Sequence, residues 1–242
     1  MSTCFMPFIG RMGNLLFQYC YLRAFCEQNG HQLCQYPWVG EKIWDIPEAV
    51  RPRSNGNPAD IVLGEDLHQR QSSLIYTRKQ VKEWLRIKPS VLDMLRPVLE
   101  NRRPVLLDWR RGTDYLGAGL VSLGNTCYAD AALVRGFSPE ECEWEVDTSP
   151  TRLPAFQGDV TAAGLGTTWV SLPAFYKLMT SKVHFRAPSS FSWWAATLGN
   201  AKVYAPVIKG VEGGKPDAYA QFVEGNWPVC ADNAPNTDLH LE

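Results

Sequence analysis

Two adjacent arginines, Arg110 and Arg111, come two residues after an apolar run at residues 105–107 that predicts a buried strand. In open α/β sheets, ligands bind at the carboxyl ends of the strands. Guanidinium groups hold phosphate through paired hydrogen bonds and stay charged at any working pH. The position therefore favours a phosphate-binding site. The alternative is a surface network in which the arginines pair with Asp108 and Asp114.

A second candidate is the serine-rich start of a predicted helix, at Ser189 and Ser190. Hydroxyl groups and free backbone N–H groups at a helix N-terminus bind anions, helped by the helix dipole. The alternative is that either serine caps the helix, and capping is the simpler explanation of this feature alone. Trp193 and Trp194 follow in the same helix, which is predicted to run to about residue 198, and are most simply core residues.

A third candidate is the turn that contains Gly10, Gly13 and Asn14, between an apolar run at residues 4–9 and a helical pattern at residues 15–28. The turn falls one residue short of the G-x-G-x-x-G pattern and is a weak dinucleotide signal. Because no suitably placed acidic residue follows it, NAD binding is disfavoured.

No group of residues in the sequence has the spacing of a catalytic metal site. The four histidines are scattered, and neither an H-E-x-x-H nor a D-x-D pattern is present. Glu143, Glu145 and Asp147 alternate and would share one strand face, where a solvated edge strand is favoured over a carboxylate metal site. We therefore expect no metal and no other cofactor.

The composition is that of a globular chain, with 45% hydrophobic and 20% charged residues among 242. The net charge of -1 provides no overall attraction for nucleic acid or an anionic membrane. Seven cysteines without C-x-x-C spacing favour reduced thiols, and Cys20 and Cys26 lie on an apolar helical pattern. With no run near the ~20 apolar residues of a membrane span and no signal peptide, we expect a soluble, cytoplasmic protein.

Strands and helices alternate along the whole sequence, which predicts an α/β fold with two lobes, residues 1–100 and 101–242, joined by a linker at 101–104. Residues 29–30 are predicted to end the first helix. Strands are predicted at 61–64, 143–146, 183–186 and, as the last one, 203–206. Helices are predicted at 78–85, 89–100, 128–134 and 172–179, and the segments 35–60 and 147–169 are predicted to be irregular.

Three segments together resemble the family 11 glycosyltransferases, the bacterial-type α-1,2-fucosyltransferases, and more distantly the wider fucosyltransferase superfamily. Residues 10–19 are similar to the family's G-R-x-G-N-x-x-F-Q-Y, and residues 109–115 to its H-x-R-R-G-D-Y. Residues 179–196 are similar to its M-S…N-S-S-F-S-W-W-x-A, and residues 71–72 match a weaker Q-S before a helix. Order and approximate spacing agree from residue 8 to about 206.

The resemblance implies a GT-B fold, in which two Rossmann-like lobes enclose a cleft. The first lobe would bind a glycan acceptor and the second a GDP-sugar, with fucose the first choice, and transfer would be inverting and metal-independent. The family roles would place Arg110 and Arg111 at the donor diphosphate, with Arg110 stabilising the leaving group. The pyrophosphate pocket would be lined, through hydroxyl and backbone N–H groups, by Ser189, Ser190 and Phe191.

The resemblance also assigns the acceptor side of the cleft, where Asn14 would face the reaction centre together with Gly10, Arg11 and Gly13. Asp114 is the candidate base for the acceptor hydroxyl, although an ion pair with either arginine would lower its pKa. Asp108 occupies the position of the family histidine in the donor site, where a carboxylate would repel a diphosphate. Two alternatives therefore stay open: a catalytically silent nucleotide- or glycan-binding relative, and a transferase that uses another nucleotide sugar.

Overall fold

The computed structural model describes residues 1–54, 56–100, 105–109, 136, 138–146, 166–186, 190–207 and 236–240. The predicted linker at 101–104 and the predicted helix at 128–134 lie outside these residues.

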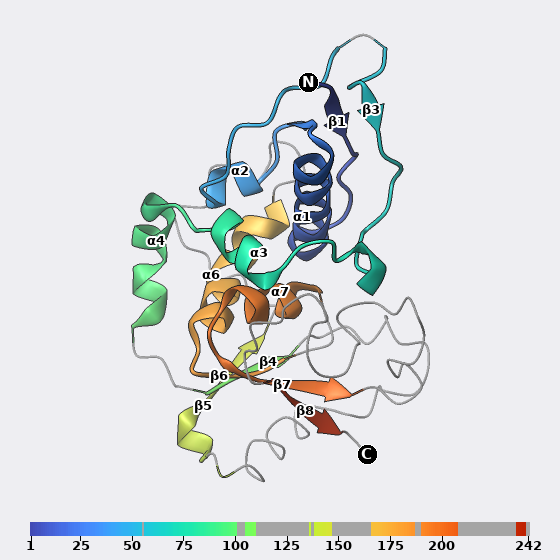
Figure 1. The fold of residues 1–242 in the computed structure, drawn as a ribbon. Coiled ribbons are helices and arrows are strands. Elements are labelled where there is room, and N and C mark those ends of the chain that lie inside the picture. The colour runs from blue at the N-terminus through green and yellow to red at the C-terminus, as the bar shows by residue number, and fades with distance from the viewer. Residues whose placement is uncertain are drawn as a thin grey trace.

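The N-terminal part of the chain forms a three-stranded parallel sheet, in the order β2-β1-β3, against which α1 packs (Figure 1). Its elements are β1 (Thr3–Phe5), α1 (Met12–Asn29), β2 (Gln32–Cys34) and β3 (Ile61–Val62). The predicted helix is confirmed but begins three residues earlier, at Met12. Gly30 ends it as predicted, in a left-handed conformation (φ 68°) that glycine adopts without steric cost.

Short helices complete the N-terminal part: α2 (Gly40–Ile43), η1 (Gln71–Ser73), α3 (Arg78–Trp84), α4 (Pro89–Leu95) and η2 (Arg96–Leu99). The two predicted helices at 78–85 and 89–100 are confirmed, the second as α4 continued by η2. A capping box starts α3, because the Thr77 side chain accepts from the backbone N–H of Gln80 and the Gln80 side chain accepts from that of Thr77. Within the segment expected to be irregular, only α2 adds a helix among the described residues.

The C-terminal part is a five-stranded parallel sheet in the order β5-β4-β6-β7-β8 (Figure 1). Its elements are β4 (Val105–Trp109), η5 (Pro139–Glu141), β5 (Cys142–Val146), α6 (Gly166–Thr180), β6 (Val183–Phe185), α7 (Ser190–Leu198), β7 (Lys202–Val207) and β8 (Asn236–His240). Counted within this sheet, the strand order is 2-1-3-4-5, as in flavodoxin-like doubly wound sheets. The chain therefore leaves the first strand, β4, on one side and returns through β6 on the other.

Two expectations for the C-terminal part were wrong. The segment expected to be irregular up to residue 169 already contains the first residues of α6, which begins at Gly166 and continues through Pro173. The strand at 203–206, confirmed as β7, is not the last one, because β8 pairs with it in parallel from Asn236 onward. Helix α7 begins at Ser190 and ends at Leu198, as predicted.

The largest hydrophobic core joins the two halves of the chain. It contains buried residues of α1, α3 and α4 together with residues of α6 and α7. The ring of Phe17 on α1 lies 4.6 Å from Trp193 and 5.0 Å from Trp194 (centroid distances), and both tryptophans are buried, which confirms the prediction that they are core residues. The main core thus crosses the predicted boundary near residue 100, while the GT-B arrangement with its cleft stays a prediction.

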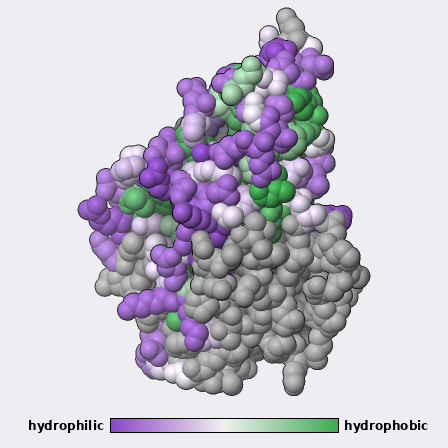
Figure 2. Space-filling model, in the orientation of Figure 1, coloured by the Kyte–Doolittle hydropathy of each residue, from purple (hydrophilic) through white to green (hydrophobic). Residues whose placement is uncertain are grey.

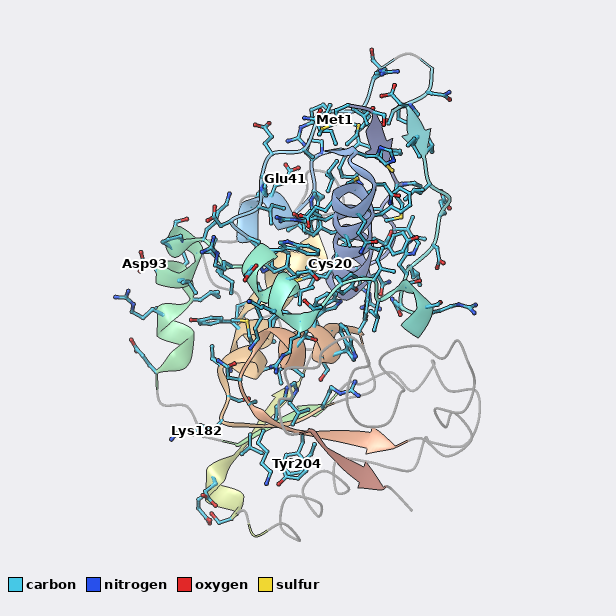
Figure 3. The ribbon with its side chains drawn as sticks, viewed as in Figure 1. Met1, Cys20, Glu41, Asp93, Lys182 and Tyr204 are labelled. Atoms are coloured by element: carbon cyan, nitrogen blue, oxygen red, sulfur yellow. The ribbon has the colours of Figure 1, made fainter. Side chains whose placement is uncertain are left out.

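Four cysteines are buried. Cys4, Cys20, Cys26 and Cys34 are free thiols, and Cys20 lies on α1 among the packed side chains of the interior (Figure 3). Burial raises the pKa of Cys26 to about 12, so this thiol stays protonated and unreactive at neutral pH. On the face shown in Figure 2, hydrophilic residues cover most of the described surface. Among the described residues, no helix combines the length and the apolar character needed to cross a membrane.

Candidate anion site at two helix N-termini

The turn that precedes α1 is held from inside the helix by Gln18, which is fully buried. The Gln18 side chain accepts from the backbone N–H of Ile9 (2.9 Å) and donates to the carbonyl oxygens of Ile9 (2.7 Å) and Asn14 (2.9 Å). Gly10 has a φ of 90°, where a side chain is strained, and a Cβ on it would overlap the amide nitrogen of Asn14. The turn and the Asn14 side chain therefore have little freedom to rearrange.

Helices α1 and α7 lie side by side with their N-termini at the same end. A Cβ on Gly13 would come within 2.6 Å of Ser190 Oγ and 2.7 Å of the backbone nitrogen of Phe191. One turn further along α1, Phe17 contacts Trp193 and Trp194. These contacts advance in the same direction along both helices, so the two helices are parallel. The glycine at position 13 is what lets the first turns touch.

The two N-termini are also joined by hydrogen bonds to one side chain, that of Asn14. Ser190 Oγ donates to Asn14 Oδ1 at 3.1 Å, and Gln69 Nε2 donates to the same oxygen at 2.7 Å. The Ser190 hydroxyl therefore binds a side chain of α1. From the sequence alone, the simpler prediction was that this serine or Ser189 caps α7. The structure thus brings Gly13 and Asn14, expected on the acceptor side, together with Ser190 and Phe191, expected on the donor side.

The electrostatics at this junction favour an anion. The N-terminus of a helix carries a partial positive charge, and its first backbone N–H groups have no partner within the helix. Neither α1 nor α7 has an acidic residue in its first turn, and no side chain caps α1. The residue at the cap position of α1 is Arg11, which is exposed and forms no ion pair with a described residue. Neither helix therefore brings a carboxylate of its own first turn to this junction.

The carboxyl ends of β4 and β6 are the second part of the candidate site. These strands are parallel neighbours, with Leu107 opposite Phe185, and β4 extends two residues further, to Trp109. After β4 the next strand, β5, is added on one side of the pair, and after β6 the next strand, β7, is added on the other side. The two strands therefore flank the switch point, which is where doubly wound sheets bind ligands. In the sequence, Arg110 and Arg111 directly follow β4, and Ser190 follows β6 after four residues.

Several predicted site residues lie outside the described ones: Arg110, Arg111, Asp114 and Ser189, together with the side chain of Asp108. Phe191 is described, and its ring is buried against Phe175 of α6 at 5.2 Å, with the planes 72° apart. The ring of Phe191 is therefore part of the core, and the role that the resemblance implies for Phe191 rests on its backbone N–H.

A buried polar pair lies behind the first turn of α7. Ser192 Oγ and His184 Nε2, on β6, share a hydrogen bond of 3.1 Å, and both residues are fully buried. Burial and the neighbouring Arg186 lower the pKa of His184 to about 3, so the imidazole is neutral. This pair fixes the start of α7 relative to the end of β6 and adds no charge.

Sequence reasoning missed Gln69 and His184. No local signal marks Gln69, because its role depends on Asn14, which is 55 residues away. His184 stands in an apolar strand pattern and shares a hydrogen bond with Ser192, so the strand pattern predicts its burial but not its partner.

Among the described residues, no group of three or more His, Cys, Asp or Glu side chains is placed to hold a metal ion. Comparisons of the chain with protein-family models, curated proteins and solved structures found no match. Function is therefore inferred from the residues themselves.

Proposed function

We propose that the protein is an inverting, metal-independent glycosyltransferase of GT-B type that moves a sugar, with fucose the first choice, from a GDP-sugar to a glycan hydroxyl. The observation that carries this proposal is the junction of α1 and α7, where Gly13 and Asn14 meet Ser190 and Phe191. Two of the three segments that resemble the fucosyltransferases thus meet in space. The third begins where β4 ends, beside β6.

The junction suits the diphosphate of a nucleotide sugar. Such a group needs N–H and O–H donors and positive charge, and it needs them without a neighbouring carboxylate. The first turns of both helices supply the backbone donors, and the amide nitrogen of Asn14, whose oxygen accepts from Ser190, supplies the side-chain donor. In this proposal, Arg110 and Arg111 add the two guanidinium groups from the adjacent strand end.

The chemistry requires these charges to act on the leaving group. Breaking the glycosyl–phosphate bond leaves positive charge on the sugar and negative charge on the departing diphosphate. Fixed cationic donors that bind the diphosphate more strongly in the transition state lower the barrier, and a single donor contributes about 3–4 kcal/mol in related oxyanion sites. Arg110 takes this role in the proposal. The acceptor hydroxyl attacks from the opposite face and loses its proton to a base, for which Asp114 is the candidate.

The first test is thermal stability with GDP, UDP, CDP, ADP and dTDP, each at about 1 mM. A ligand at 100 times its Kd stabilises the fold by about 2.7 kcal/mol, which raises the melting temperature by several degrees. We expect GDP alone to give this shift, and we expect Ser190→Ala to reduce it. A shift with a different nucleotide would keep the transferase and change the donor, whereas no shift with any nucleotide would contradict the proposal.

The second test separates a transferase from a silent binding protein. A transferase slowly hydrolyses its donor without acceptor, and the expected products are GDP and the free sugar. Arg110→Ala is expected to remove most of this activity and leave the melting temperature unchanged, and EDTA is expected to have no effect. Intact donor after prolonged incubation, together with a GDP-induced shift, would identify a binding protein without catalysis.

A further inference from the structure

Gln69 lies beside the candidate site and belongs to none of the segments that suggested it. Its side chain is 5% exposed, and its Nε2 donates to Asn14 Oδ1 at 2.7 Å. The residue comes from the segment between β3 and η1, so it reaches α1 from a third part of the chain.

Two hydrogen bonds occupy the amide oxygen of Asn14. A carbonyl oxygen has two acceptor positions, and Gln69 Nε2 and Ser190 Oγ occupy both. Two donors on Oδ1 fix the amide so that its nitrogen faces the other way, beside Gly10. Nδ2 donates to no described residue, and the Asn14 side chain is half-buried, so its two N–H groups are available to a ligand.

The segment that carries Gln69 is fastened to α1 at a second point. The ring of His68 stacks on Tyr21, with centroids 3.7 Å and planes 11° apart. Tyr21 is seven residues, or two helical turns, beyond Asn14. Consecutive side chains of an extended chain point to opposite sides, so His68 and Gln69 can both meet α1 only where the backbone bends. His68 provides this bend with a φ of 49°, which a residue other than glycine rarely adopts.

The backbone conformation of His68 is supported on its own segment. The Asp66 carboxylate accepts from the backbone N–H of His68 at 3.2 Å. A strained backbone of this kind persists where the surroundings hold it, and such positions cluster at functional sites. The positive φ of His68 turns the chain so that Gln69 Nε2 lies against Asn14 Oδ1.

We propose that Gln69 is a positioning residue that holds the Asn14 amide so that its N–H groups face the ligand. The ligand atom opposite Nδ2 is then a hydrogen-bond acceptor, a phosphate oxygen of the donor or a hydroxyl oxygen of the glycan. This inference rests on the proposed function for the identity of the ligand, but the orientation of the amide is a property of the free protein.

The decisive variant is Gln69→Glu, which keeps the size of the side chain and replaces its donor by an acceptor. Asn14 can then satisfy the new carboxylate only by turning Nδ2 toward it, which presents Oδ1 to the ligand. Gln69→Leu removes the donor without replacement and serves where the carboxylate prevents folding. The matched control is Gln28→Glu, the same change at a glutamine that donates to the Ile75 carbonyl on the exposed side of α1.

The first readout is the pair of side-chain amide signals of Asn14 in the NMR spectrum of the free protein, assigned by their loss in Asn14→Asp. We expect both Gln69 variants to shift these signals and Gln28→Glu to leave them in place. Unchanged signals in a folded Gln69 variant would overturn the inference. This result does not depend on any activity, so it stands even if no nucleotide binds.

The second readout is kinetic. We expect Gln69→Glu to lower kcat/KM by about tenfold or more, the effect of one misdirected hydrogen bond, and Gln28→Glu to leave it unchanged. If Gln69→Glu already weakens donor binding or slows donor hydrolysis, the oxygen that Asn14 Nδ2 binds belongs to the donor. If the variant slows only transfer to the glycan, that oxygen belongs to the glycan. Kinetic constants equal to those of the control would overturn the positioning role, even where wild-type turnover confirms the transferase.

Discussion

Ser190 donates a hydrogen bond to the amide oxygen of Asn14 across 176 residues of sequence, at 3.1 Å. Each residue lies in the first turn of its helix, so the bond fixes two helix N-termini together at their positive ends. Parallel helices in this arrangement repel each other electrostatically, and the apolar contacts of Phe17 with Trp193 and Trp194 offset that repulsion. A bound anion would remove it.

Gly13→Ala is expected to separate the two helices. The added methyl group would lie within 2.8 Å of backbone and side-chain atoms of Ser190 and Phe191, and the backbone atoms cannot move without shifting α7. We expect a loss of about 1–3 kcal/mol in the free energy of unfolding, measured by urea denaturation, and loss of the GDP-induced thermal shift. Gly64→Ala is the control, because a Cβ there meets nothing within 4 Å. Equal stability of the two variants would contradict the close approach.

Gln18→Leu is expected to release the turn before α1. The substitution keeps the volume and leaves the backbone N–H and C=O of Ile9 without their side-chain partner. These hydrogen bonds are part-buried, so we expect the free energy of unfolding to fall by about 1–2 kcal/mol. The same change at Gln28, which makes one hydrogen bond at the surface, should cost less than about 1 kcal/mol. A loss at Gln18 no larger than at Gln28 would show that the helix holds the turn without this side chain.

Helices α1 and α7 could be predicted from the sequence because their signals are local. Apolar spacing marked α1, and a glycine in the left-handed region ended it. The same reasoning placed the start of α7 at its serines and the two tryptophans in the core. Strand β2 carries too little pattern, because it reads only Gln-Leu-Cys and is defined by its pairing with β1.

The parts that could not be predicted depend on contacts between distant segments. The helix predicted at 172–179 would have Pro173 in its first turn, where proline is tolerated although it lacks an N–H. In the structure α6 begins six residues before this predicted start, at Gly166, so the Trp169 carbonyl lacks its usual donor at position 173. Asn14 and Ser190 were both predicted as site residues, but Gln69, which donates to the same oxygen of Asn14 as Ser190 does, has no motif of its own.

Arg78→Met is expected to loosen the C-terminal end of α7. The Arg78 guanidinium is buried and donates from Nε to the Thr197 carbonyl at 2.9 Å and from Nη2 to the Gly199 carbonyl at 2.7 Å. A cation suits this end of a helix, and its removal leaves two carbonyls without these donors. We expect a loss of about 3 kcal/mol in the free energy of unfolding.

Arg96→Met is the matched control for Arg78→Met. Arg96 pairs with Asp93 at 2.8 Å, and both side chains are exposed, so the change should cost less than about 1 kcal/mol. Arg78→Lys keeps the charge with a single point donor and should fall between the two. A ranking in which Arg78→Met is no more harmful than Arg96→Met would remove the capping role.

The last prediction concerns acid stability and His184. Because burial lowers its pKa in the fold to about 3, the unfolded chain binds a proton on this residue near pH 6.5 while the folded chain does not. The contribution of His184 is therefore fully present above pH 6.5 and is lost as the pH falls from 6.5 toward 3, at about 1.4 kcal/mol per pH unit. Urea denaturation at a series of pH values measures this slope. His184→Gln should flatten it, because glutamine cannot be protonated. A slope unchanged in His184→Gln would mean that other groups cause the acid sensitivity and that the neutral His184–Ser192 pair does not govern it.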